Sequence, residues 1–263
     1  MNFYELIGFS EEMPEPDPGK PRLPPPGDAC VFLDMDGTLV DIADRPDGIA
    51  ISPDLGALLD DLLDRTDGRT AIVSGRDTAT LKGFLPGFRG VMVGSHGAER
   101  RGGGLPDVTS ELPSDFGCIR KVLRTYADHR DGVLYEEKPY SAALHFRQAP
   151  DAMPGVERFL EAFVADWEGL TLHRAKMALE IMLSDVSKGR AVADLHSLWG
   201  DGTTPIAIGD DRTDEGMLRY AVERGGIGVK VGDGPTAASC RLSTPREVRA
   251  LLRDWLDDGG HRP

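Results

Sequence analysis

The chain has 263 residues, a formal net charge of −14 at pH 7 and a sequence pI near 4.8. Hydrophobic residues make up 40% and charged residues 28%, which is typical of a globular protein with an ample core. An acidic chain repels nucleic acid and anionic membranes, and no apolar run approaches the roughly 20 residues of a membrane helix. We therefore expect neither nucleic acid nor a membrane as a partner.

The N-terminal part is expected to be a leader. Residues 11–27 contain seven prolines, several acidic residues and little apolar content, which predicts an extended or disordered segment over 1–27. No secretory signal is visible, and the three cysteines are far apart and odd in number. This pattern predicts reduced, buried thiols in a cytoplasmic protein without an obligate protein partner.

The first predicted strand, Cys30–Leu33, ends in two carboxylates, Asp34 and Asp36. Residues i and i+2 of an extended segment project to the same side, so both carboxylates can face one ligand. Two carboxylates this close repel each other unless a cation or a proton lies between them. The strand end is therefore a candidate site.

Alternating helices and strands follow. Ser52 and Pro53 suit the first positions of a helix whose leucines recur on one face, and Gly68 suits its end. A strand over Thr70–Val73 leads into Ser74 and Arg76, and then a helix and a further strand over Gly90–Val93 are expected. This alternation predicts a parallel sheet.

The middle of the chain has a different pattern. Helix, strand, strand is expected twice, at Ser114–His129, Val133–Lys138, Ser141–Arg147, Val156–Ala165, Leu170–Lys176 and Ala178–Leu183. This order indicates an antiparallel α+β unit inserted into the α/β chain. The α/β pattern returns after Lys188, with a strand that leads into Asp210, and a final helix opens at Thr244-Pro245 with capping-box spacing.

Four segments in order resemble motifs I to IV of the haloacid-dehalogenase (HAD) phosphatases. They are Asp34-Met35-Asp36-Gly37-Thr38, Ser74-Gly75-Arg76, Ser187-Lys188-Gly189 and Gly209-Asp210-Asp211-Arg212-Thr213-Asp214. The resemblance implies an α/β fold, with a HAD-like Rossmannoid parallel-sheet core over 28–111 and 184–263. It also implies an α+β cap domain of the C2 type over 112–183.

The resemblance implies a role for each motif residue. Asp34 would be the nucleophile, Asp36 the general acid and base, and Ser74 and Lys188 the groups that contact the phosphoryl oxygens. Mg²⁺ would be held by the Asp34 carboxylate, the Asp36 carbonyl and Asp210. The remaining residues would support the site or orient its waters: Arg76, Asp211 and Asp214. Alternatively, Arg76 is a surface residue at a helix start, Asp211 and Asp214 are solvated loop acids, and Asp214 caps the next helix.

Other segments are similar to trehalose-6-phosphate phosphatases. These are Gly94-Ser95-His96-Gly97-Ala98-Glu99, Glu136-Glu137-Lys138, Ala143–Pro150 and Ala178-Leu179-Glu180-Ile181. The likeness implies sugar contacts by Glu136, Lys138, His145, Arg147, Lys176 and Glu180. Alternatively, each of these is a solvated strand residue. Ala178 departs from relatives that often carry Asn at that position, and the roles of His96 and Glu99 are left open.

The leading prediction is a Mg²⁺-dependent phosphatase that hydrolyses trehalose 6-phosphate through an aspartyl-phosphate. One alternative is another HAD sugar phosphatase with a C2 cap, and a second is a catalytically silent protein that binds a sugar phosphate. The silent form would be expected to lack Asp34, Asp36, Lys188 or Asp210, and the sequence has all four.

Overall fold

A computed structural model describes residues 21–42, 48–49, 51–175, 177–200 and 202–258. The chain divides into two compact units: a larger unit, Met1–Val108 with Ser187–Pro263, and an inserted unit, Thr109–Val186. The junctions fall at 108/109 and 186/187, whereas 111/112 and 183/184 were expected.

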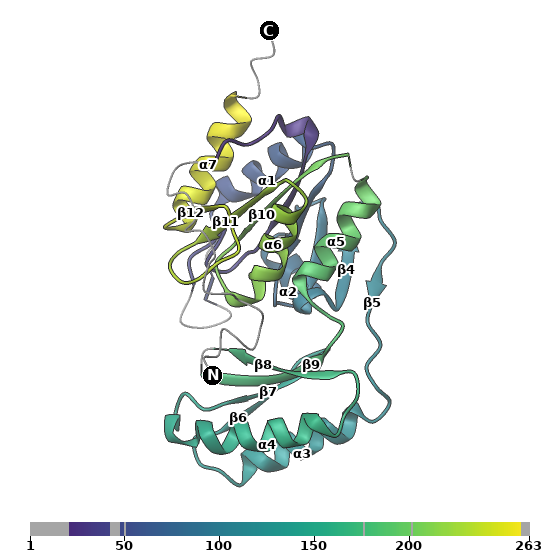
Figure 1. The fold of residues 1–263 in the computed structure, drawn as a ribbon, viewed down its shortest axis with the longest axis vertical. Coiled ribbons are helices and arrows are strands. Elements are labelled where there is room, and N and C mark those ends of the chain that lie inside the picture. Colours follow the sequence, from purple (N-terminus) through teal and green to yellow (C-terminus); the bar gives the residue numbers. More distant parts are fainter. Residues whose placement is uncertain (1–20, 43–47, 50, 176, 201, 259–263) are drawn as a thin grey trace. The chain divides into compact units, whose positions relative to one another are not determined.

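The larger unit contains, within the described ranges, an eight-stranded sheet of order β12-β11-β10-β1-β2-β3-β4-β5 (Figure 1). Strands β1 to β3 and β10 to β12 pair in parallel, and β4 runs antiparallel to β3. The strands are β1 (Ala29–Leu33), β2 (Thr70–Val73), β3 (Val91–Gly94), β4 (Glu99–Gly102), β5 (Val108–Thr109), β10 (Thr204–Gly209), β11 (Ile227–Val231) and β12 (Cys240–Leu242).

Helices cover both faces of this sheet. Val31 and Leu33 of β1 pack in one apolar cluster with residues of α1, α2 and α7, while Cys30 and Phe32 pack in another with residues of α5 and α6. Every residue of β1 is buried, as expected for a strand covered on both sides. The helices are α1 (Pro53–Arg65), α2 (Thr78–Phe84), α5 (Lys188–Trp199), α6 (Glu215–Glu223) and α7 (Pro245–Asp258).

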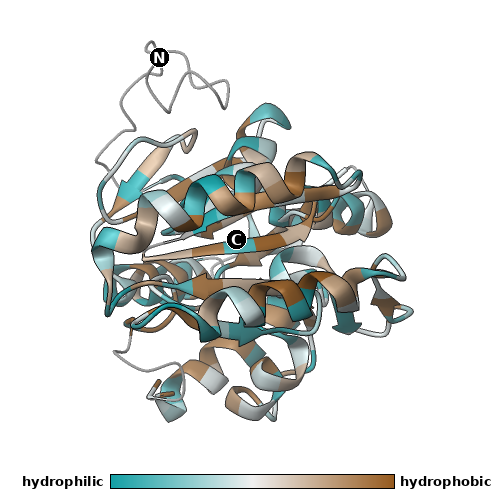
Figure 2. Cartoon of the chain, turned by 90° about the horizontal axis from the view of Figure 1, so that it is seen from below, coloured by the Kyte–Doolittle hydropathy of each residue, from teal (hydrophilic) through white to brown (hydrophobic). Residues whose placement is uncertain are grey.

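Helix α1 begins as the sequence predicts. The Ser52 hydroxyl accepts a hydrogen bond from the Asp54 N–H at 3.3 Å, and Pro53 occupies the first turn. The predicted leucines are buried: Leu55, Leu58, Leu59 and Leu62. In Figure 2 the helices show alternating hydrophobic and hydrophilic residues along their length, which is the pattern of helices with one buried face.

The last residues of the predicted leader are ordered against the larger unit. Residues 1–20 lie outside the described residues, but Leu23 packs against the apolar cluster, Pro26 is buried, and the Pro24 carbonyl accepts the Trp255 indole N–H at 2.6 Å. Residues 21–25 form no helix or strand, and Pro25 has an extended backbone (φ −53°, ψ 137°), so this part of the segment is extended and packed against apolar surface.

The inserted unit is the predicted antiparallel α+β unit. Its four-stranded sheet has the order β6-β7-β9-β8 among the described residues, and α3 and α4 contribute to its apolar cluster. The elements are α3 (Phe116–Asp128), β6 (Leu134–Glu137), β7 (Ser141–His145), α4 (Met153–Ala165), β8 (Leu170–Ala175) and β9 (Ala178–Leu183). Strand β7 ends two residues before the predicted Arg147.

Two expectations about the chain as a whole can be checked directly. Cys30 is buried as expected, Cys240 is partly exposed, and Cys118 is exposed on α3, so the prediction of burial is wrong for Cys118. None of the described helices has both the length and the apolar character that a membrane crossing requires.

Candidate active site

Three strands of the larger unit deliver the first motif residues to one edge of the sheet. Asp34, Ser74 and Asp210 follow the last residues of β1, β2 and β10, and β1 lies between the other two strands. Their registers align, since Leu33 pairs with Ile208 on one side and with Ile72 on the other. The carboxyl edge of a parallel sheet is where α/β proteins bind ligands.

Lys188 joins this edge from the start of α5. Its Nζ donates hydrogen bonds of 2.6 Å to the Oδ1 atoms of both Asp34 and Asp214, and the residue is only 4% exposed. Burial lowers the pKa of Lys188, but the charges of Asp214 and Asp34 outweigh it and raise the pKa above its ordinary value. The ammonium group is therefore a fixed positive charge beside the predicted nucleophile.

Asp214 accepts hydrogen bonds at both of its carboxylate oxygens. Its Oδ1 holds Lys188, and its Oδ2 accepts the backbone N–H groups of Asp210 at 3.0 Å and Asp211 at 2.9 Å. Asp211 is exposed, and its side chain completes a capping box with Asp214 at the short 3-10 turn Arg212–Asp214. Asp214 therefore shapes the acidic loop and orients Lys188, so capping and function are combined in one side chain.

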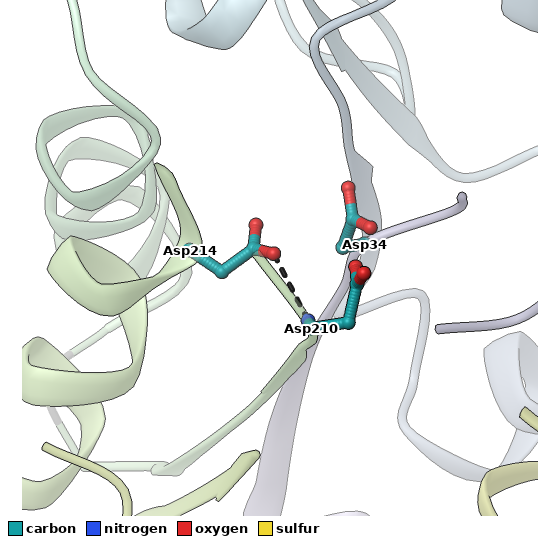
Figure 3. A group of neighbouring side chains, drawn as sticks. All are labelled: Asp34, Asp210 and Asp214. Atoms are coloured by element: carbon teal, nitrogen blue, oxygen red, sulfur yellow. Dashed lines mark hydrogen bonds between the residues drawn. The ribbon is translucent and has the colours of Figure 1, made fainter. Parts of the chain in front are cut away.

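The carboxylates of Asp34, Asp210 and Asp214 form an acidic cluster in which one oxygen of each lies within 4.8 Å of the others (Figure 3). Burial and the charge of Asp214 raise the pKa of Asp34 well above its ordinary range, against the pull of Lys188. Burial and the charges of Asp214 and Asp211 raise the pKa of Asp210 to about 6. The cluster carries more negative charge than one lysine balances.

The donor set fits a hard divalent cation. Both oxygens of Asp214 already accept hydrogen bonds, whereas Asp34 and Asp210 face each other in Figure 3. Gly37 lies against this pair, since a Cβ added to it would be 2.2 Å from Oδ2 of Asp210. Carboxylate oxygens in a buried, electron-rich site are the ligands that Mg²⁺ prefers.

Asp36 is bound to Arg76 by two hydrogen bonds. Nε of Arg76 donates to Oδ2 at 2.6 Å and its terminal nitrogen donates to Oδ1 at 2.8 Å. The Arg76 side chain is 18% exposed, so the alternative of a surface arginine does not hold. Ser74 is 2% exposed, and its hydroxyl oxygen accepts the Arg76 N–H at 3.2 Å, which leaves the hydroxyl proton to be donated elsewhere.

Two further residues support the acidic loop and were not identified from the sequence. The Thr38 hydroxyl donates to Oδ1 of Asp210 at 3.3 Å, and buried Lys230 donates from β11 to the Asp210 carbonyl. Thr38 belongs to the first motif, and Lys230 is the one charged residue in the strand Ile227–Val231. A lysine inside an otherwise apolar buried strand is the signal that could have revealed it.

The inserted unit gathers several predicted sugar contacts on one face of its sheet. Glu136 pairs with Ala143, and Ala143 pairs with Glu180, so the two carboxylates project from the same face. Lys138 donates to Oε2 of Glu180 at 2.9 Å, and the Ser141 hydroxyl donates to its Oε1. The opposite face carries Leu144 and Ile181, which belong to the apolar cluster with α3 and α4.

The remaining predicted contacts differ in their placement. The Nε2 atom of His145 lies 2.7 Å from Oε2 of Glu136, and this hydrogen bond is the main cause of a lowered Glu136 pKa. Arg147 is exposed in a turn beyond the end of β7, not within the strand as predicted. Lys176 lies outside the described residues. Glu136, Lys138, His145 and Glu180 therefore form one polar cluster.

The parallel sheet, the inserted α+β unit and the strand-end cluster of Asp34, Lys188 and Asp210 define a HAD-like hydrolase fold. A haloacid dehalogenase-like hydrolase from Bacteroides thetaiotaomicron has this fold, with a TM-score of 0.64 at 18% identity over 86% of this chain and 99% of that one.

The chain belongs to the trehalose-phosphatase family, whose model matches residues 32–245. It is 35% identical over 227 residues to a probable trehalose-phosphate phosphatase of Sinorhizobium fredii, with 84% of each chain covered. It is 33% identical over 223 residues to the trehalose-6-phosphate phosphatase of Escherichia coli, again with 84% of each covered. A solved trehalose-6-phosphate phosphatase related protein has a TM-score of 0.72 at 29% identity, over 88% of this chain and 99% of that one.

Proposed function

We propose that this chain is a phosphoric monoester hydrolase that converts trehalose 6-phosphate and water to trehalose and phosphate, with Mg²⁺ as its cofactor. Family membership supports the reaction class and the sugar. The observation that carries the chemistry is the buried Lys188, whose ammonium group touches both Asp34 and Asp214 while Asp210 faces Asp34.

In the first step a carboxylate oxygen of Asp34 attacks phosphorus, and the bond from phosphorus to the sugar oxygen breaks. Asp36 gives its proton to that oxygen, so trehalose leaves as a neutral alcohol and Asp34 carries the phosphoryl group. In the second step Asp36 takes a proton from water, whose oxygen attacks phosphorus and releases phosphate from Asp34. The two steps balance with water as the only co-reactant.

Asp36 must exchange partners during this cycle. Both of its oxygens accept from Arg76 in the structure, and a guanidinium stabilises the ionised carboxylate. At least one oxygen would therefore leave Arg76 to carry the proton to the leaving group. Arg76 would then hold Asp36 as an ionised carboxylate between the proton-transfer steps.

Lys188 and Ser74 would stabilise the charge that spreads over the phosphoryl oxygens, because one presents a fixed ammonium group and the other a hydroxyl proton. Asp34, Asp210 and the Asp36 carbonyl would hold Mg²⁺. The bound ion would neutralise the acidic cluster and the phosphate dianion, which otherwise repel each other. Asp214 would keep Lys188 in place.

The polar face of the inserted unit would bind the sugar. Glu180 and Glu136 offer acceptors, and Lys138 offers donors, for vicinal hydroxyl groups. His145, Arg147 and Lys176 are the further contacts proposed from the family resemblance. Ala178 lies on the same face as Glu180. Its methyl side chain has no polar atom, so it does not make the sugar contact expected from the Asn that relatives often carry at this position.

The test is phosphate release by the purified chain from trehalose 6-phosphate, compared with sucrose 6-phosphate, glucose 6-phosphate and an aryl phosphate in Mg²⁺. We expect kcat/KM for trehalose 6-phosphate to exceed the others by at least about tenfold. Similar values for several sugar phosphates would favour a broader sugar phosphatase. Binding without phosphate release from any substrate would favour a silent sensor instead.

A further inference from the structure

The segment Gly94–Glu99 has no role in the mechanism above, although it connects the last residue of β3 to the first residue of β4 and its six residues are distinctive in sequence. It lies in the larger unit and contacts two of the loops that carry site residues.

Ser95 and His96 fix the backbone of the Ser74 loop. The Ser95 N–H donates to the Arg76 carbonyl at 2.8 Å, and the His96 N–H donates to the Ser74 carbonyl at 3.0 Å. Both residues adopt the left-handed region that non-glycine residues rarely occupy, with φ of 50° for Ser95 and 59° for His96. Such a conformation persists only where surrounding contacts impose it, and here those contacts lead to Ser74.

The glycines allow the segment and the loops to approach closely. The His96 ring lies on Gly75, where an added Cβ would be 2.6 Å from the ring. A Cβ on Gly94 would lie 2.7 Å from the Thr78 nitrogen, and a Cβ on Gly97 would lie 2.7 Å from the Ser187 carbonyl oxygen. The segment is therefore packed against the backbone that precedes Lys188 as well as the backbone around Ser74.

The Glu99 carboxylate accepts three hydrogen bonds, from Thr78 and from Ser95. Its Oε1 accepts the Thr78 N–H at 3.0 Å and the Ser95 hydroxyl at 3.2 Å, and its Oε2 accepts the Thr78 hydroxyl at 2.6 Å. Glu99 is 6% exposed and Thr78 is 7% exposed, so the bonds between these two residues are largely shielded from bulk water. One carboxylate thus joins the segment to the first residue of α2, directly after the loop that carries Ser74 and Arg76.

We propose that Glu99 is a positioning residue of the phosphatase reaction, which holds the Ser74 loop in place through Thr78 and the backbone of Ser95 and His96. This inference rests on the proposed function, because the loop it positions is the one assigned to the phosphoryl group. Glu99 itself does not touch the reacting atoms in this assignment.

The central experiment compares Glu99→Ala, Glu99→Gln and wild type with trehalose 6-phosphate and an aryl phosphate. We expect Glu99→Ala to lower kcat/KM at least about tenfold on both substrates, because a displacement of about 1 Å at a reacting group can cost a hundredfold. Glu99→Gln keeps an acceptor for the Thr78 N–H and should stay within about threefold of wild type.

Asp77→Ala is the matched control, because Asp77 makes the same kind of bonds at the same helix. It accepts the Thr80 N–H at 2.7 Å and the Thr80 hydroxyl at 2.9 Å. If Glu99 merely caps α2, both alanine variants will lose equal activity at equal loss of Tm, and the proposal is wrong. We expect Asp77→Ala to change kcat/KM less than about threefold.

A second comparison tests the route through Ser74. In a Ser74→Ala background, Glu99→Ala should cost less than about threefold, since the group that it positions is already absent. Independent, multiplying losses would overturn the proposal. Should Glu99→Ala fail to fold, Thr78→Val removes the bond to Oε2 at nearly constant volume, and an unchanged kcat/KM would count against the proposal.

Binding of inorganic phosphate separates this inference from the proposed function. In Mg²⁺, Glu99→Ala should raise the Kd for phosphate at least about threefold, whether or not the wild type turns over a sugar phosphate. A wild type that hydrolyses nothing would refute the function alone. An unchanged phosphate Kd together with unchanged kcat/KM would refute the positioning role of Glu99.

Discussion

Replacing Lys188 by methionine removes the only ammonium group bonded to Asp34 among the described residues while it keeps a similar side-chain volume. The wild-type contacts are 2.6 Å to each of two carboxylates, and all three side chains are at most 5% exposed. At an effective dielectric constant of about 20, unit charges at this separation attract by about 6 kcal/mol before the cost of desolvation. The net cost of leaving buried partners unpaired is about 3–5 kcal/mol.

Both stability and activity should fall. For a unit of this size, each kcal/mol corresponds to about 2–4 °C in Tm, so we expect a decrease of about 6–20 °C in EDTA. Activity should fall at least about 10³-fold, or about 4 kcal/mol, because the phosphoryl charge loses its cation and Asp34 binds a proton more readily. Thermal unfolding and phosphate release measure the two effects.

The loss of stability should depend on pH with a definite sign. In the wild type, the raised pKa of Lys188 keeps its stabilising contribution intact at neutral pH. In the variant, the pKa of Asp34, which is already raised, would rise further above its unfolded value, so the destabilisation is greatest above that raised value. The difference in Tm between variant and wild type should therefore shrink as the pH falls from about 8 to about 5.

Lys230→Met is the matched control, because Lys230 is equally buried but bonds the Asp210 carbonyl instead of Asp34. It should lose stability and retain at least about tenfold more activity than Lys188→Met. Equal activity in the two variants, or a Tm difference from wild type that grows as the pH falls, would refute the reasoning.

Three further predictions concern the nucleophile, the metal and the sugar. Asp34→Asn should abolish turnover with little loss of fold, since an amide does not attack phosphorus usefully; retention of more than about 5% of wild-type activity, with deamidation excluded by mass spectrometry, would contradict it. Exhaustive dialysis against EDTA should abolish activity and lower Tm, and Mg²⁺ should restore both, because the acidic cluster needs a cation; full turnover in EDTA would count against a metal site. Glu180→Ala should lower kcat/KM for trehalose 6-phosphate at least about tenfold, or roughly 1.4 kcal/mol, and scarcely affect an aryl phosphate; equal losses on both would indicate a folding defect.

Local patterns were sufficient to predict most elements of the fold. The Ser52-Pro53 start and the leucine periodicity of α1 depend on neighbours within the same helix, and both appear in the structure. The apolar strands before Asp34, Ser74 and Asp210 likewise carry their own signal, because a strand buried on both faces has a nearly continuous apolar sequence. The boundaries were less accurate, and β7 ends before Arg147 because the chain turns there.

Long-range contacts could not be read from such patterns. Lys188 lies 154 residues from Asp34 and 26 from Asp214, and only the folded sheet brings the three together. The pairing of Arg76 with both oxygens of Asp36 and the support of Asp210 by Lys230 are of the same kind. The sequence shows which residue types are present for these contacts, but it does not show which side chains will be paired in the folded protein.

The sequence by itself determined the residues available for phosphoryl chemistry, their order and the strand ends from which they project. The tertiary structure decided which carboxylate faces Asp34 and which has both oxygens engaged by hydrogen bonds, as with Asp210 and Asp214. It also showed that Glu99 accepts a hydrogen bond from Thr78, the first residue of α2, directly after the loop that follows β2. The physical reason is that burial and hydrogen-bond geometry depend on elements distant in the chain, whereas helix caps and strand periodicity depend on near neighbours.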